Sequence, residues 1–260
     1  MDLGSHLNHL WRILATGLGF LVFTTMGLLF RFVSVPLLIL GYRDPSARKR
    51  AARKVIQVSF ALFIRFLVFL RIMELHVQGA EKLNDQPRLL CPSHPTLIDV
   101  VILMSLVKNA SCIVKASLKD SFALRAPIMA AGFVTNDSGP ELVDTCAKAL
   151  REGDSLIIFP EGTRTRPGVA PHLQHGAAAT SLAADTPITP IRITCEPPAL
   201  MKGVPWYHVP PRKMRFTVQV LENIDQCPYS EMLKSEGRPI AVRRLTQRLK
   251  EKLFPASEIS

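Results

Sequence analysis

The sequence lacks the signatures of several large protein classes. Its five cysteines are scattered and none forms a C-x-x-C pair, so we expect neither a disulfide framework nor a zinc cluster. P-loop, G-x-S-x-G and G-x-G-x-x-G motifs are absent, which removes the commonest nucleotide-binding and serine-hydrolase patterns. The lack of a sustained repeat excludes solenoid, collagen-like and coiled-coil architectures. Unpaired cysteines suit a reducing compartment, which places the working part in the cytosol.

Acidic residues are few beside basic ones. Lys and Arg number 32 against 21 Asp and Glu in 260 residues, a net charge of +11, while 48% of the residues are hydrophobic. This apolar content excludes disorder for the bulk of the chain. The positive balance points to an anionic partner, namely a membrane surface, a nucleic acid, or a phosphorylated or CoA-type ligand. The basic residues lie beside apolar stretches rather than among aromatic ones, so no nucleic acid is expected.

Residues 1–73 form a hydrophobic N-terminal segment, distinct in composition from residues 74–260. Residues 13–30 carry no charge, and the apolar run resumes after Arg31 until Pro36 interrupts it. A bilayer span needs about 20 apolar residues. We therefore expect 12–41 either to cross the membrane once or to dip in and return at Pro36. A signal peptide is not indicated, because the apolar region is long and no cleavage site follows it.

A basic connector joins this stretch to a second apolar one over 55–73. The connector should stay cytoplasmic and lie against anionic headgroups. Its basic residues are Arg43, Arg48, Lys49, Arg50, Arg53 and Lys54. Residues 55–73 contain Arg65 and Arg71, and we expect an interfacial amphipathic helix there. The alternative is a helix packed on the globular core. The prediction is thus an inner (cytoplasmic) membrane protein whose globular domain faces the cytoplasm.

From residue 74 onward, short apolar runs with β-branched residues alternate with helical segments. This alternation predicts an α/β fold with a mixed, largely parallel sheet flanked by helices. The expected strands cover 73–78, 88–92, 111–115, 132–135, 155–159, 188–195 and 213–221. The expected helices cover 95–107, 121–130, 139–151, 173–184 and 239–253. Ligands of such sheets gather where strands end, and two unusual sequence blocks fall at such junctions.

The first block is Ser93-His94-Pro95, followed by an apolar segment that contains Asp99. Pro95 suits the first position of a helix, so His94 is expected at its cap and Asp99 one turn inside. A carboxylate among aliphatic residues needs a partner, and His94 is the nearest. Such a pair would make His94 a general base for a hydroxyl. The alternative is a plain helix cap with a first-turn charge.

The second block runs Phe159-Pro-Glu161-Gly162-Thr163-Arg164 after a strand. Gly162 allows a tight turn or a close backbone approach to a ligand. Arg164 can hold a phosphate bidentately, and the Thr163 hydroxyl can add a donor. Glu161 can orient Arg164 or accept a hydrogen bond from a substrate hydroxyl. The alternative is a surface loop with one Glu–Arg pair.

Together the two blocks resemble the motifs of a known family. His94-Pro-Thr-Leu-Ile-Asp99, followed sixty residues later by Phe159-Pro-Glu-Gly-Thr-Arg164, is similar to the lysophospholipid acyltransferase, or 1-acylglycerol-3-phosphate acyltransferase, family. Two weaker blocks agree with the resemblance. They are Ile113-Val114-Lys115 with Gly132-Phe133-Val134, and 187–193.

This resemblance implies an α/β fold with a membrane-anchored N-terminus and transfer of a fatty acyl group to a lysolipid hydroxyl. The partners would be acyl-CoA or acyl-carrier protein, the lysolipid acceptor and the membrane. His94 would take the hydroxyl proton while Asp99 holds the imidazolium. Glu161, Gly162, Thr163 and Arg164 would bind the acceptor, with Arg164 on its phosphate, and Lys115 is a further expected substrate contact. No metal, other cofactor or acyl-enzyme is expected.

Two positions depart from the family pattern. Asn136 stands where many members carry an Arg, and His175 precedes Gly176 where many carry Lys. Both changes remove positive charge from the expected acceptor pocket. A zwitterionic lysolipid, or an acceptor from a specialised pathway such as polyene lipids, therefore stays open beside lysophosphatidate. Two other functions also stay open: hydrolysis of thioesters or lipid esters by the same His–Asp pair, and a non-enzymatic lipid-binding scaffold.

Overall fold

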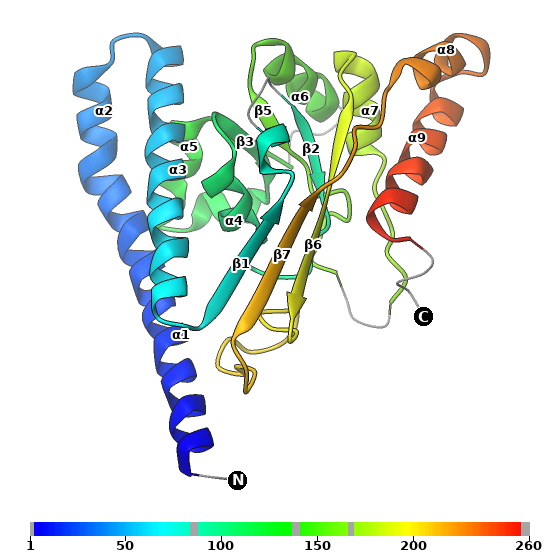
Figure 1. Ribbon diagram of the computed structural model, residues 1–260. Helices are drawn as coiled ribbons and strands as arrows, with labels where there is room; N and C mark the ends of the chain where they lie inside the picture. The colour runs from blue at the N-terminus through cyan, green and yellow to red at the C-terminus, as the bar shows by residue number, and fades with distance from the viewer. Residues whose placement is uncertain (1–2, 84–87, 137–140, 166–168, 256–260) are drawn as a thin grey trace.

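The computed structural model describes residues 3–83, 88–136, 141–165 and 169–255. Within these residues a seven-stranded sheet forms the centre of the molecule, with helices on both faces (Figure 1). The strands are β1 (Met73–Gln78), β2 (Leu89–Pro92), β3 (Ala110–Val114), β4 (Val134–Thr135), β5 (Ser155–Ile157), β6 (Ile188–Glu196) and β7 (Met214–Val220). Their order is β1-β7-β6-β2-β5-β3-β4, and all neighbours are parallel except β6 and β7. The predicted mixed, largely parallel α/β sheet is confirmed.

The helices fall into an N-terminal group and a group that covers the sheet. The N-terminal group comprises α1 (Leu3–Leu29), a π-helical segment (Phe30–Ser34), α2 (Val35–Gly41) and α3 (Pro45–Phe69). The others are α4 (Asp99–Leu106), α5 (Arg125–Ala131), α6 (Leu142–Arg151), α7 (Gly176–Ala184), α8 (Cys227–Ser235) and α9 (Arg238–Leu253), with 3-10 turns at Ala80–Leu83 and Ala116–Asp120. Helix α8 was not predicted, and residues 139–140 of the predicted helix 139–151 lie outside the described residues.

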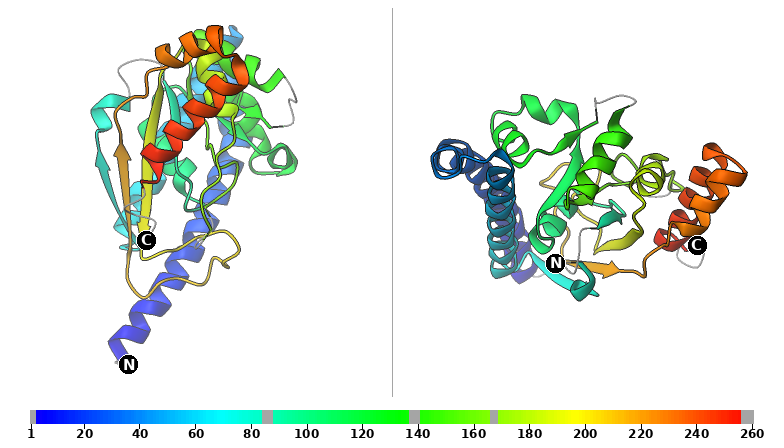
Figure 2. Two further views of the ribbon diagram at one scale, coloured as in Figure 1. Left: turned by 90° about the vertical axis from the view of Figure 1, so that its right-hand side faces the viewer. Right: turned by 90° about the horizontal axis from the view of Figure 1, so that it is seen from above.

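Consecutive residues of the central strands point into different hydrophobic clusters, because side chains alternate across a strand. Leu90 and Ile157 belong to a cluster with residues of α3 and α4, whereas Leu89 and Leu156 belong to one with residues of α6, α7 and α9. Seen from above, the N-terminal helices lie at one side of the sheet and α8 and α9 at the other (Figure 2). Burial of both faces explains why these strands read as uninterrupted apolar runs.

The N-terminal helix does not turn back at Pro36. Helices α1 and α2 are joined through the π-helical segment, which lets Pro36 fit without a reversal. The chain reverses later, where Asp44 caps α3 by accepting hydrogen bonds from the main-chain N–H groups of Ser46 (3.1 Å) and Ala47 (2.9 Å). The expected return at Pro36 is therefore wrong. By length and composition, residues 6–41 could cross a membrane.

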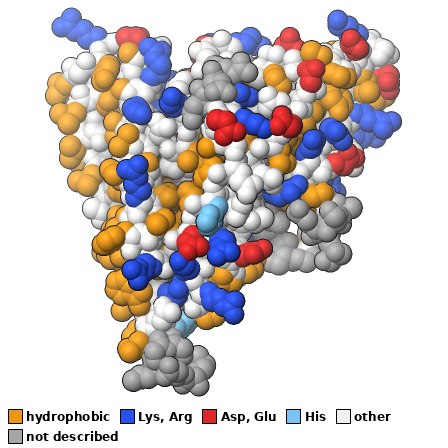
Figure 3. All heavy atoms as spheres, in the orientation of Figure 1, with side chains coloured by type: hydrophobic (Ala, Val, Ile, Leu, Met, Phe, Trp, Pro, Cys, Tyr) orange, Lys and Arg blue, Asp and Glu red, His pale blue; other side chains and the backbone are white. Residues whose placement is uncertain are grey.

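Helix α3 packs on the domain with one side, which confirms the alternative stated for residues 55–73. Ile56, Phe63 and Leu67 are buried in the cluster shared with α4 and β7. Its other side exposes Leu62 and Phe69, to 58% and 81%. Hydrophobic side chains gather along this flank of the molecule (Figure 3). Interfacial placement of that outer side stays a prediction.

Two basic residues of the connector turn inward instead of facing headgroups. Arg53 is 2% exposed, and its guanidinium lies 2.6 Å from Oδ1 of Asp154, while Lys49 lies 2.9 Å from Oδ2. Arg53 also donates to the Ala131 carbonyl (2.9 Å) and to Asn109 (3.1 Å). Burial alone would raise the pKa of Asp154, but the hydrogen bonds from Arg53 and Lys49 outweigh it and lower that pKa. A buried carboxylate needs such partners, so the headgroup prediction is wrong for these two residues.

Candidate active site

His94 and Asp99 meet directly after strand β2. Nδ1 of His94 lies 2.9 Å from Oδ2 of Asp99, which is fully buried. The same carboxylate accepts hydrogen bonds from the main-chain N–H of Thr96 (2.7 Å) and from its hydroxyl (2.5 Å). The Thr96 N–H can only donate, so Oδ2 of Asp99 is an acceptor, and this arrangement suits a hydrogen bond from Nδ1 of His94 to the same oxygen. The outer nitrogen, Nε2, therefore keeps its lone pair for a proton.

The local backbone structure that brings His94 and Asp99 together differs from the prediction. Helix α4 begins at Asp99 itself, not at Pro95, and it is preceded by an irregular segment with a bend at Thr96 and a turn at residues 97–98. The Asp99 side chain closes this turn through Thr96, because a short acidic side chain competes well for nearby N–H groups. His94 is thus held by a turn that its partner stabilises, and it does not act as a helix cap.

Glu161 of the second motif and Thr165 just after it form hydrogen bonds with the main chain of His94. Oε1 of Glu161 accepts a hydrogen bond from the His94 N–H (2.9 Å), and the Thr165 N–H donates to the His94 carbonyl (2.7 Å). Phe159 covers the imidazole, with ring centroids 4.1 Å apart. Gly162 makes the turn between them at a φ of 66°, which favours glycine. Sequence reasoning missed the roles of Thr96 and Phe159, although both lie inside the motifs.

Glu161 does not orient Arg164, as one reading of the motif expected. It is buried, and its carboxylate accepts from His94 and from the Thr165 hydroxyl (2.9 Å). Burial raises its pKa, and the hydrogen bond from Thr165 offsets only part of that shift. The glutamate therefore positions the turn that holds His94, and its burial disfavours the charged form relative to water.

Replacing Glu161 by glutamine is expected to stabilise the protein at neutral pH. A raised folded-state pKa means that wild-type stability falls as pH rises from the ordinary glutamate value through the folded one. Glutamine keeps the oxygen acceptor but loses the charge. The Tm advantage of E161Q should therefore grow as pH rises through the acidic range in thermal unfolding scans.

The opposite trend is expected of the control Glu222→Gln, because the hydrogen bond from Lys82 lowers the pKa of Glu222. For that variant the Tm difference from wild type should become more negative as pH rises. Parallel pH profiles for E161Q and wild type would contradict a raised pKa of the buried Glu161.

Arg164 and Thr163 contact the β6–β7 loop, residues 197–213. Nη1 of Arg164 donates to the carbonyls of Leu200 (3.1 Å) and Met201 (3.2 Å). The hydroxyl of Thr163 accepts a hydrogen bond from Nζ of Lys202 (2.7 Å). Arg164 therefore links the second motif to the β6–β7 loop and does not form the expected pair with Glu161.

The two departures from the family pattern have structural partners. Oδ1 of Asn136 accepts from the Ala116 N–H (2.9 Å) and caps the turn after β3. Nδ1 of His175 lies 3.1 Å from the Thr246 hydroxyl on α9, which itself donates to Val242. Both side chains therefore serve local structure.

A cavity of about 680 Å³ opens beside His94. Its polar lining includes five of the predicted site residues: His94, Lys115, Gly162, Thr163 and Arg164. Asp99 and Glu161 lie behind His94 and outside that lining. The remaining wall is mostly apolar and comes from α1, α3, α4 and β3, with Phe23, Phe60 and Met104 among its residues. This volume lies within the range of about 300–1,000 Å³ usual for small-molecule sites.

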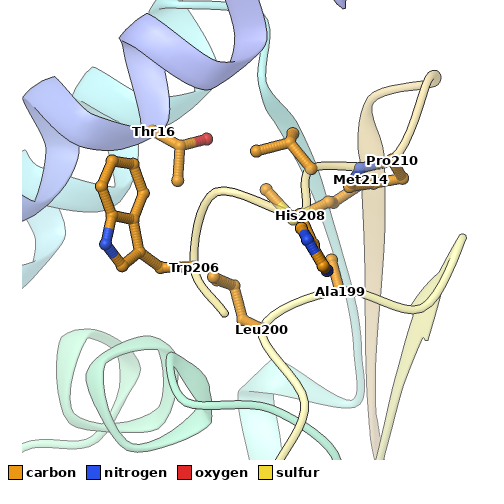
Figure 4. Close-up of a pocket in the computed structure, with 8 residues that line it drawn as sticks. Thr16, Ala199, Leu200, Trp206, His208, Pro210 and Met214 are labelled. Atoms are coloured by element: carbon orange, nitrogen blue, oxygen red, sulfur yellow. The ribbon is translucent and has the colours of Figure 1, made fainter. Parts of the chain in front are cut away.

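The β6–β7 loop also reaches the N-terminal helix. Figure 4 shows Trp206 against α1 near Thr16, with Leu200 and His208 on the same loop. The rings of Trp206 and Phe20 lie 5.6 Å apart, and a Cβ on Gly17 would come within 3.3 Å of the indole. The loop therefore connects Arg164 to the hydrophobic helix, and Leu200 and Lys202 of this loop line the cavity.

Comparison with known proteins finds similarity to acyltransferases. A model of the family described as Acyltransferase matches residues 74–194. Residues 74–194 belong to the acyltransferase family. The resemblance found from the sequence motifs is thereby confirmed.

Two relatives resemble the chain more specifically. It is 24% identical over 127 residues to the chloroplastic 1-acyl-sn-glycerol-3-phosphate acyltransferase LPAT1 of Arabidopsis thaliana. That match covers 46% of this chain and 36% of the relative, so it spans about a third of the relative's length. Among solved structures, the fold is similar to that of the 1-acyl-sn-glycerophosphate (LPA) acyltransferase PlsC from Thermotoga maritima. The TM-score is 0.64 at 19% identity, covering 93% of this chain and 97% of that one.

Proposed function

We propose that this protein transfers a fatty acyl group from acyl-CoA or acyl-carrier protein to the hydroxyl of a lysophospholipid. The observation that carries the proposal is the His94–Asp99 pair, with Nδ1 and Oδ2 2.9 Å apart, at the end of an apolar cavity. An imidazole whose Nδ1 is held by a carboxylate suits proton removal from a hydroxyl by Nε2. The family membership of residues 74–194 supports the same chemistry.

In the proposed reaction the acceptor hydroxyl attacks the thioester carbonyl while Nε2 of His94 takes its proton. The new C–O bond forms, the C–S bond breaks, and the imidazolium returns the proton to the departing thiolate. Asp99 stabilises the imidazolium through Nδ1 and fixes the ring orientation. The fatty acyl chain occupies the apolar part of the cavity, and Gly162, Thr163 and Arg164 face the acceptor at its polar end.

The N-terminal helices support a location of this site at a lipid surface. The outer flank of α1–α3 exposes many large apolar side chains, among them Leu21, Leu37, Leu40, Leu62 and Phe69. Such a flank suits burial in a membrane rather than exposure to water. We propose that it lies in the cytoplasmic membrane, with the sheet domain on the cytoplasmic side.

An assay with purified protein in detergent tests the proposal. Labelled acyl-CoA and acyl-carrier protein are each supplied with a panel of lysophospholipids, and both free thiol and acylated lipid are measured. We expect thiol release to depend on the acceptor and to equal the lipid formed. Thiol release without an acceptor would instead establish a hydrolase, and no turnover with either donor would favour a lipid-binding scaffold.

Filling the cavity is expected to shorten the preferred acyl chain. Ser59 of α3 lines the cavity, so Ser59→Phe removes space for the end of the chain. For a long-chain donor, kcat/KM should fall about tenfold, which corresponds to roughly two buried methylenes. A shorter donor should be affected less.

The matched control is Val58→Phe, because Val58 is the preceding residue of the same helix and is 45% exposed. It adds a similar bulk outside the cavity and should leave the chain-length profile as in wild type. Equal profiles for both variants would contradict the assignment of this cavity to the acyl chain.

A further inference from the structure

The charged residues of the cavity are all of one sign. Among the described residues that line it, no Asp or Glu occurs, whereas Lys115, Arg164 and Lys202 are present beside His94. The apolar part of the cavity suits an acyl chain, and its cationic part suits an anionic group on the same or a neighbouring substrate. Lys202 belongs to neither sequence motif and comes from the β6–β7 loop.

Lys202 is held in place through both its main chain and its side chain. The carbonyls of the two preceding residues, Leu200 and Met201, accept hydrogen bonds from Arg164, and that of Leu200 also accepts one from the Leu97 N–H (3.1 Å). Its ammonium donates to the Thr163 hydroxyl at 2.7 Å. A lysine fixed in this way differs from an ordinary surface lysine, whose flexible stem carries much rotamer entropy.

Positive charge in the cavity does not come from the two positions that depart from the family pattern, 136 and 175. Asn136 is neutral and caps the turn at Ala116, and His175 is bonded to Thr246 of α9. Lys202 instead lies beside the motif that contains Arg164, because its ammonium donates a hydrogen bond to the hydroxyl of the preceding residue, Thr163. The pair combines a planar guanidinium, which can bind an oxyanion through two parallel bonds, with a compact point charge.

We propose that Lys202 binds the phosphate of the lysophospholipid acceptor together with Arg164, an inference that rests on the proposed acyl transfer. The acceptor is favoured over the donor because the β6–β7 loop contacts α1 through Trp206 and Phe20. A lysolipid that enters from the lipid-facing helix meets this loop first. Lys202 thereby supplies positive charge that the Asn136 and His175 positions do not.

Steady-state kinetics of Lys202→Gln and Lys202→Arg test this assignment, using the best lysophospholipid acceptor and a fixed acyl donor. K202Q should raise the acceptor KM about tenfold to a hundredfold, as expected for a lost hydrogen bond to a charged group. Its donor KM, kcat and Tm should stay close to those of wild type. K202R should restore most of the acceptor affinity. Inhibition by glycerol 3-phosphate, used as a competitive probe, should weaken in K202Q by a similar factor to the rise in acceptor KM.

The matched control is Lys213→Gln, which removes the charge of a lysine that pairs with Glu74 outside the cavity lining. It should leave both KM values unchanged. If K202Q raised the donor KM, Lys202 would bind the donor and not the acceptor. If K202Q lowered kcat and Tm and raised both KM values together, the role of Lys202 would be structural. Either result overturns the inference, as does a wild-type enzyme that accepts only unphosphorylated lipids. Absence of transfer by wild type with every acceptor would instead refute the proposed function.

Discussion

Replacing His94 by alanine is expected to lower acyl transfer about a thousandfold, within the range that general base catalysis contributes. The variant keeps the main-chain contacts of residue 94 with Glu161 and Thr165, so the turn should stay folded. What it loses is Nε2, the group that would accept the hydroxyl proton. Rates of lipid formation should be measured beside Tm, so that a loss of activity can be separated from a loss of fold.

Two further variants sharpen this result. Asp99→Asn should also reduce kcat strongly, because the amide can donate to Nδ1 and so favour the wrong tautomer of His94. His76→Ala serves as the control, since the His76 side chain is 56% exposed and lies on β1, outside the cavity lining. It should behave as wild type. If the acyl-transfer rate of His94→Ala stayed within tenfold of wild type, His94 would not be the general base.

Replacing Arg53 by methionine is expected to destabilise the fold by about 3 kcal/mol, the lower end of the range for breaking a buried ion pair. The lower end applies because Lys49 still contacts Asp154. The guanidinium of Arg53 also bonds to the Ala131 carbonyl and to Asn109. Its loss therefore affects the contacts of α3 with the end of α5 and with the turn before β3. Urea-induced unfolding in a fixed detergent would measure the change.

Arg50→Met is the appropriate comparison for Arg53→Met. Arg50 lies on the same helix one turn earlier and is exposed, so its replacement should change stability by no more than about 0.5 kcal/mol. If Arg53→Met were equally mild, the ion pair with Asp154 would not fasten the N-terminal helices to the domain.

The features predicted correctly from the sequence depend on local pattern. Alternating apolar runs located the strands, and the spacing of His94 and Asp99 indicated their contact. Even there the mechanism of contact differed, because a turn around Thr96 replaced the expected first turn of a helix. Spacing in the sequence constrains which side chains can meet, but it does not determine the backbone path between them.

The features that were missed depend on contacts between distant segments. Arg53 reads as one more positive charge in a basic run, and its burial depends on distant partners, above all Asp154, about a hundred residues further on. Lys202 lies in a proline-rich loop with no motif of its own, and it reaches the site because Arg164 holds the residues before it. No local periodicity reports such pairings.

The hydrophobic N-terminal helices also form part of the candidate active site. Gly19, Phe23 and Gly27 of α1 and Phe60 and Phe63 of α3 form part of the wall around the same space that holds His94. A shortened chain starting at residue 74, of the kind often made to obtain soluble material, would keep the imidazole and lose one side of the chamber in front of it. Under the proposed function, membrane attachment and the choice of fatty acid would be properties of the same two helices, and selection on one would constrain the other.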